Sequence, residues 1–124
     1  MNKKNAFLMI GLVLASMVLA TCGSTGGSSF PTGKFILSDS AYEGVYFNKD
    51  GTWLAFAFGQ ELAKGTYHVK GDLYTEDSSA DACPTDATYK YSFDGTNLKF
   101  ELVGEDPCQH RRESYDGVPY VLSK

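Results

Sequence analysis

Residues 42–76 decide the fold that the sequence predicts: YEGVYFNKDGTWLAFAFGQELAKGTYHVKGDLYTE. The stretch contains four short apolar runs, separated by turn-forming residues at 49–51, 60–61 and 70–71. Asp-Gly and Lys-Gly connections between such runs are typical of β-hairpins, because glycine supplies the positive φ that the turn needs. The stretch therefore predicts an antiparallel meander.

The same pattern extends to the C-terminal half of the chain. In residues 89–93 and 98–102, aromatic and leucine side chains alternate with Lys, Ser and Glu, which indicates one buried face and one solvent face. The segment 104–116 is polar and predicts a loop or one short helical turn. Strands are expected at 33–38, 45–47, 52–58, 65–70, 72–76, 89–93, 98–102 and 118–122, with a turn at 40–43 and a polar loop at 77–86.

Eight short strands joined by tight turns predict an all-β protein. The first choice is an eight-stranded antiparallel up-and-down barrel, because closure removes exposed strand edges. A sandwich of two sheets is the alternative.

Residues 1–21 are expected to be a bacterial lipoprotein signal peptide. Lys3 and Lys4 precede an apolar segment at 6–20, which is short for a membrane span. The following Leu-Ala-Thr-Cys at 19–22 resembles a lipoprotein cleavage site, so Cys22 is the expected lipidation site, although Thr21 departs from the usual small residue. Ordinary secretory cleavage after Ala20, which leaves Cys22 free, is the alternative. The Gly- and Ser-rich residues 22–32 predict a flexible tether to one domain at 33–124.

The remaining charge is acidic. Without the signal peptide the chain keeps nine Lys and Arg against 15 Asp and Glu, a net charge of −6. This balance argues against a nucleic-acid partner and against electrostatic binding to anionic lipid. The expected location is the extracytoplasmic side of the bacterial cell envelope, lipid-anchored, or secreted if Cys22 is free. Cys83 and Cys108 then form the expected disulfide in an oxidising compartment.

Several motifs occur in a fixed order along the chain. They are Phe47-x-x-Asp50-Gly51-Thr52-Trp53, Gly65-Thr66-Tyr67-x-Val69-x-Gly71-Asp72, Tyr89-x-Tyr91 and Asp106-x-Cys108-x-x-Arg111. Together they resemble the small bacterial lipocalin-like (calycin-type) lipoprotein domains over most of residues 33–124. This resemblance implies a small hydrophobic ligand. It also implies that Arg111 packs over Phe35, which stands in place of the family's first-strand tryptophan, and closes one barrel end. Arg112 is then expected to be solvent-exposed.

The predicted barrel interior is mostly aromatic. The residues expected to point inward are Phe47, Trp53, Tyr67, Val69, Leu73, Tyr89, Tyr91, Phe93, Leu98, Phe100 and Leu102. Eight strands enclose a space that such side chains nearly fill, so at most a small pocket is expected at one mouth. Trp53, Tyr67, Tyr89 and Tyr91 are its predicted lining, suited to a flat or short apolar molecule with one polar group.

No catalytic group, metal site or cofactor is expected. His68 and His110 have no identifiable partner, and the two cysteines lack zinc-site spacing. We therefore expect a binding protein without enzymatic activity. The alternative is an envelope interaction protein or a lysozyme-type hydrolase inhibitor with a filled barrel. Residues 52–58 are apolar on both faces, which predicts either a covering segment, such as 104–116 or the N-terminal arm, or a docking surface.

Overall fold

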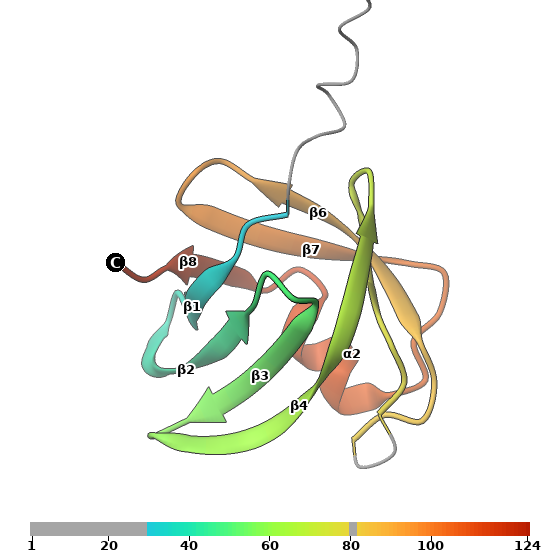
Figure 1. Cartoon of the computed structure of the whole chain (residues 1–124), viewed down its shortest axis with the longest axis horizontal. Helices are drawn as coiled ribbons and strands as arrows, with labels where there is room; N and C mark the ends of the chain where they lie inside the picture. Colours follow the sequence, from blue (N-terminus) through green and yellow to red (C-terminus); the bar gives the residue numbers. More distant parts are fainter. Residues whose placement is uncertain (1–29, 80–81) are drawn as a thin grey trace, which may run out of the picture.

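The structure is a computed structural model that describes residues 30–79 and 82–124. Its strands are β1 (Gly33–Leu37), β2 (Ser40–Phe47), β3 (Thr52–Ala57), β4 (Gln60–Lys70), β5 (Leu73–Glu76), β6 (Ala87–Phe93), β7 (Asn97–Val103) and β8 (Pro119–Leu122), and helix α2 (Gln109–Tyr115) lies between β7 and β8. Each strand pairs antiparallel with the next, and β8 pairs with β1. The predicted closed up-and-down barrel is confirmed (Figure 1).

The strands differ from their predicted bounds mainly around β2 and β4. The expected turns at 40–43 and 60–61 are strand instead. The β3–β4 turn lies at Phe58 and Gly59, whose φ angles are 51° and 78°. Two consecutive positive φ values make the tight hairpin turn that follows the right-handed twist of the strands, so β4 begins at Gln60.

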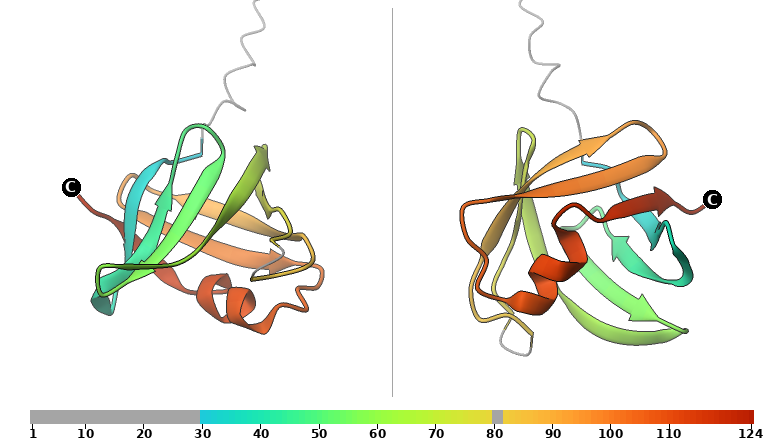
Figure 2. Two further views of the ribbon diagram at one scale, coloured as in Figure 1. Left: turned by 60° about the horizontal axis from the view of Figure 1, so that its bottom comes forward. Right: turned by 180° about the vertical axis from the view of Figure 1, so that it is seen from behind.

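Alternating connections give the barrel two different ends. One end, here called the N-terminal end, carries the start of β1 and the β2–β3, β4–β5 and β6–β7 turns. The other, here called the helix end, carries the β1–β2 and β3–β4 turns, the β5–β6 loop and α2. Figure 2 shows α2 lying across the helix end, away from the start of β1. The segment 104–116 thus contains two helical turns rather than a loop.

The N-terminal end is filled with aromatic rings. Phe30 is buried there and packs against a ring of five aromatic side chains, with centroid distances of 4.9–6.3 Å: Phe47, Tyr67, Tyr74, Tyr91 and Phe100. Phe30 had been assigned to the tether from the sequence. The first strand does begin at Gly33, but the side chain of Phe30 already belongs to the barrel core. Residues 22–29 of the tether, which include Cys22, and the predicted signal peptide lie outside the described residues.

One predicted inward residue is wrong. Leu73 is exposed, whereas its neighbour Tyr74 is completely buried. Lys70 pairs with Leu73 and Val69 with Tyr74 across the β4–β5 hairpin. Residues directly opposite each other share a face of the sheet, so the inward Val69 places Tyr74 in the core and Leu73 in solvent. The other ten predicted inward residues belong to the core or pack against it.

The predicted disulfide is confirmed. Cys83 of the β5–β6 loop is bonded to Cys108, directly before α2, with their Cα atoms 5.6 Å apart. The bond therefore ties two of the connections at the helix end together. Within the described residues, no helix is long and apolar enough to cross a membrane.

Candidate functional site: a cavity at the helix end

A cavity of about 480 Å³ lies at the helix end, between α2 and the parts of β2, β3 and β4 that are nearest to this end. Its lining is mostly apolar and includes the aromatic side chains of Trp53, Tyr115 and Tyr120. Two ionisable side chains, Glu76 and Arg111, are both buried and also line it. The exposed Leu62 and His110 lie at its rim. The barrel interior is therefore filled at one end and open at the other, with more space than the expected small pocket.

The four predicted pocket residues do not come together. Trp53 lines the cavity. Tyr67 and Tyr91 pack under Phe30 at the opposite end, where their hydroxyls donate to the Asn48 and Gly71 carbonyls at 2.6 and 3.3 Å. Tyr89 is completely buried and donates its hydroxyl to the Asp106 carboxylate. Of the four residues, Trp53 lines this cavity and the three tyrosines do not.

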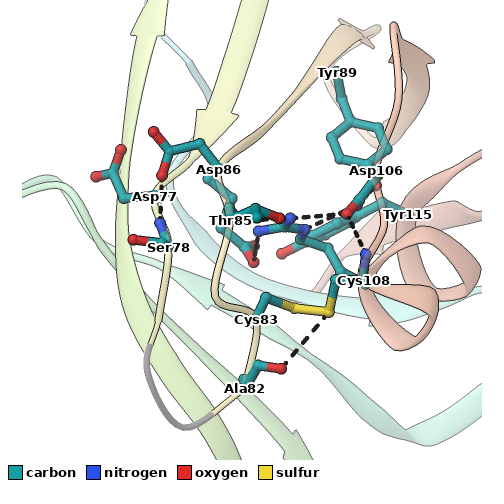
Figure 3. Close-up of polar contacts among 12 residues, drawn as sticks. Asp77, Ser78, Ala82, Cys83, Thr85, Asp86, Tyr89, Asp106, Cys108 and Tyr115 are labelled. Atoms are coloured by element: carbon teal, nitrogen blue, oxygen red, sulfur yellow. Dashed lines mark hydrogen bonds and ion pairs between the residues drawn. A yellow bond between two sulfur atoms is a disulfide. The ribbon is translucent and has the colours of Figure 1, made fainter.

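Asp106 is the centre of a polar cluster under α2 (Figure 3). Its carboxylate accepts from Arg111 through Nε and Nη2, both at 2.8 Å, and from the Cys108 amide at 2.9 Å. Burial raises the pKa of Asp106, but the hydrogen bonds from Arg111, Tyr89 and Cys108 outweigh it and hold the pKa below its ordinary value. Asp106 is therefore ionised and neutralises the buried guanidinium.

Arg111 closes the helix end by a different contact from the one expected. Besides Asp106, its Nη2 donates to the Thr85 carbonyl at 2.8 Å, so the side chain joins α2 to the β5–β6 loop. Phe35 instead packs edge-on against Phe47 and Phe93. The predicted Arg111–Phe35 pair is wrong, because a buried guanidinium is better compensated by carboxylates than by a ring face.

Glu76 is the second carboxylate beside Arg111. Its Oε2 is 3.6 Å from Arg111 Nη1, and its Oε1 accepts from the Tyr74 hydroxyl at 3.2 Å. Burial raises the pKa of Glu76 to about 7, although Tyr115 and Arg111 oppose the shift. This side chain can therefore exchange a proton near neutral pH inside the cavity.

The sequence analysis missed Glu76 as a site residue. The signal was present in the alternation of β5, because Tyr74 and Glu76 share one face. Because Leu73 was expected to point inward, Glu76 was expected on the solvent face of the strand. The pair of Asp106 and Arg111 was present in the motif Asp106-x-Cys108-x-x-Arg111, but the sequence pattern does not say that the two side chains meet.

The apolar outer face of β3 is part of a separate shallow groove. The exposed side chains Tyr42 and Phe58 stack at 5.6 Å, and Lys34 Nζ lies 5.3 Å from the Phe56 ring. The groove is lined by residues 34–61 and by none of 104–116, so α2 does not provide the expected cover. Among residues 30–79 and 82–124, no cluster of three or more His, Cys, Asp or Glu side chains could hold a metal ion.

No protein-family model, curated protein or solved structure matches this chain. The class of the protein is therefore defined by its own geometry. It is a small, closed, disulfide-linked antiparallel barrel with one filled end and one cavity that contains buried ionisable groups.

Proposed function

We propose that this protein binds a small, mainly apolar molecule in the cavity at the helix end. The cavity itself supports this function best: about 480 Å³ of space lined mainly by apolar side chains, some of them aromatic, together with a few polar groups. Binding sites for small molecules commonly have this size and lining. The alternative, an interaction protein or hydrolase inhibitor with a filled barrel, is less well supported because the helix end is open.

The proposed location is the extracytoplasmic face of the bacterial envelope, with a lipid on Cys22. The resemblance of residues 1–22 to a lipoprotein signal supports this proposal, as does the disulfide, which is typical of an oxidising compartment. A lipidated protein should remain with the membrane fraction of its host. The variant Cys22→Ala should move to the soluble extracytoplasmic fraction, and a membrane-bound variant would contradict the lipid anchor.

Ligand binding can be followed through Trp53, the only tryptophan of the chain, because it lines the cavity. A titration with the neutral probe 1-aminoanthracene should give saturable energy transfer from the indole. The variant Ala63→Phe places a ring in the cavity lining and should abolish the signal. The matched control Ser92→Phe alters an exposed position of β6 and should keep it. If Ala63→Phe gave the same titration curve as the wild-type protein, binding in this cavity would be refuted.

A further inference from the structure

Two of the residues that line the cavity each carry a buried hydrogen-bond donor without an acceptor. Trp53 Nε1 and Arg111 Nη1 are both buried, and neither has a hydrogen-bond partner among the described residues. Buried donors are almost always paired, so each unpaired donor calls for an explanation. Both belong to the lining of the same cavity.

The unused part of the Arg111 guanidinium is well defined. Of its three nitrogens, Nε and Nη2 donate to Asp106 and Thr85. Nη1 carries two further N–H groups. Its nearest acidic oxygen, Oε2 of Glu76 at 3.6 Å, is close enough for charge attraction but too far for a hydrogen bond. The geometry leaves Nη1 free to bind an additional acceptor.

We propose that the ligand carries a carboxylate, which accepts hydrogen bonds from Arg111 Nη1 and Trp53 Nε1 while the apolar lining encloses its apolar body. This inference rests on the proposed function and specifies its ligand class. A carboxylate offers two acceptor oxygens and suits the planar guanidinium. An ammonium group has only donors and would leave both protein donors unpaired.

The charges around the site require a proton to accompany the ligand. Asp106 already neutralises Arg111, so an arriving carboxylate meets a second negative charge if Glu76 is ionised. The groups that face Glu76 are Tyr74 on its own strand, Tyr89 on β6, Arg111 and Tyr115 on α2, and Tyr120 on β8. Glu43 and His110 are the titratable groups nearer the cavity rim. Among the groups that face Glu76, Arg111 is the cation, and Asp106 already pairs with it.

Glu76 can remove the repulsion between its own carboxylate and that of the ligand by taking up one proton from solvent. Its pKa of about 7 makes that uptake inexpensive near neutral pH. The ligand carboxylate then takes the place of ionised Glu76 beside the guanidinium, and the net charge of the site is unchanged. Above pH 7 the affinity for the carboxylate should fall by up to about tenfold per pH unit, because each binding event must protonate Glu76.

The test compares three probes with the same rings and different heads: 2-naphthoate, 2-methylnaphthalene and 2-naphthylmethylamine. Isothermal titration calorimetry at about pH 6.5 should show the carboxylate binding at least about tenfold more tightly than the headless probe. Only the carboxylate should weaken between about pH 7 and pH 8. Equal affinities, or a preference for the amine, would overturn this inference while leaving the proposed function intact. No binding by any probe would overturn both.

Two conservative variants separate the roles of the side chains. Trp53→Phe keeps an aromatic ring but removes the N–H, so it should weaken 2-naphthoate by about tenfold and 2-methylnaphthalene much less. Glu76→Gln cannot titrate and should remove the loss of affinity above pH 7. The control Glu105→Gln changes an exposed acid and should keep the wild-type pH profile. An unchanged profile in Glu76→Gln would contradict the proton coupling. Arg111 is left intact in these tests, because it also joins α2 to the β5–β6 loop.

Discussion

Glu76 couples the stability of the barrel to pH. Its pKa rises from 4.5 to about 7 on folding. Between these values the unfolded chain loses the proton while the folded protein keeps it, so the free energy of unfolding falls as pH rises. The loss is on the order of 3 kcal/mol and is complete above about pH 7. Asp106 has a lowered pKa and acts in the opposite sense, but only at lower pH, where its carboxylate becomes protonated.

The variant Glu76→Gln should remove most of this pH dependence. Urea unfolding of the wild-type protein should give a lower free energy of unfolding at about pH 8 than at about pH 5. The variant should be nearly as stable at both, and at least as stable as the wild type at the higher pH, because it buries no charge. Glu105→Gln serves again as the exposed control. A wild-type pH dependence in Glu76→Gln would mean that other groups control stability in this range.

At the level of single residues, the sequence predicted chemical type better than contact partners. Trp53 lines the cavity, and its inward orientation follows from the alternation of β3. Arg111 lies at a barrel end, but its partner is Asp106 and not Phe35, because sequence order does not reveal that Asp106 lies within reach. Arg112 was expected to be solvent-exposed, but it is half-buried and donates to the Asp106 carbonyl at 2.7 Å.

Among the elements, the β3–β4 hairpin contains an unusual turn residue. Phe58 has a φ of 51° and is the only described non-glycine residue with a positive φ. L-residues other than Gly, Asn and Asp adopt this conformation at a cost of about 1–2 kcal/mol. The ring of Phe58 is 70% exposed and gains only its stacking on Tyr42. The turn is therefore less stable than it would be with Gly, Asn or Asp at position 58.

Replacing Phe58 with Asn should stabilise the protein. Asn-Gly is the preferred pair where both turn residues have positive φ, so Phe58→Asn should raise the free energy of unfolding by about 0.5–1 kcal/mol. Phe58→Ala keeps the unfavourable backbone and loses the stacking, so it should be neutral or slightly destabilising. Thermal unfolding of both variants checks the argument. A gain in stability with Ala equal to that with Asn would assign the effect to the exposed ring instead.

The β3–β4 hairpin also shows which parts of the fold can be predicted from the sequence and which cannot. The barrel and its eight strands follow from period-two alternation and glycine turns, which are local signals. The exact turn at Phe58 and Gly59 was missed because Phe carries no turn preference, and this shifted the expected start of β4. Likewise, a one-residue difference in the β4–β5 turn exchanged Leu73 and Tyr74 and thereby concealed Glu76.

For the whole molecule, the difference between the two barrel ends depends on Phe30. This side chain fills the N-terminal end, while the helix end keeps its cavity. Sequence inspection missed Phe30 because a single aromatic residue after a Gly- and Ser-rich stretch resembles part of a linker. Its partners come from β2, β4, β5, β6 and β7, a set that only the closed barrel brings together.

Truncating Phe30 should therefore destabilise the entire barrel. Phe30→Ala should lower the free energy of unfolding by about 3–4 kcal/mol, because it leaves a cavity among five rings. Phe30→Leu keeps most of the apolar volume and should cost less than about 1.5 kcal/mol. Urea unfolding followed by intrinsic fluorescence measures both. A loss below about 0.5 kcal/mol in Phe30→Ala would show that the barrel core does not depend on this residue.

The position of Phe30 also determines how the molecule would respond to mechanical load. Any tension on the preceding chain reaches the barrel first at this side chain, before it reaches the hydrogen bonds of β1 with β2 and β8. Extraction of one aromatic ring would then be the first yielding event under force. The cavity, at the other end of the barrel, would keep its shape until β1 itself separated from its two neighbours.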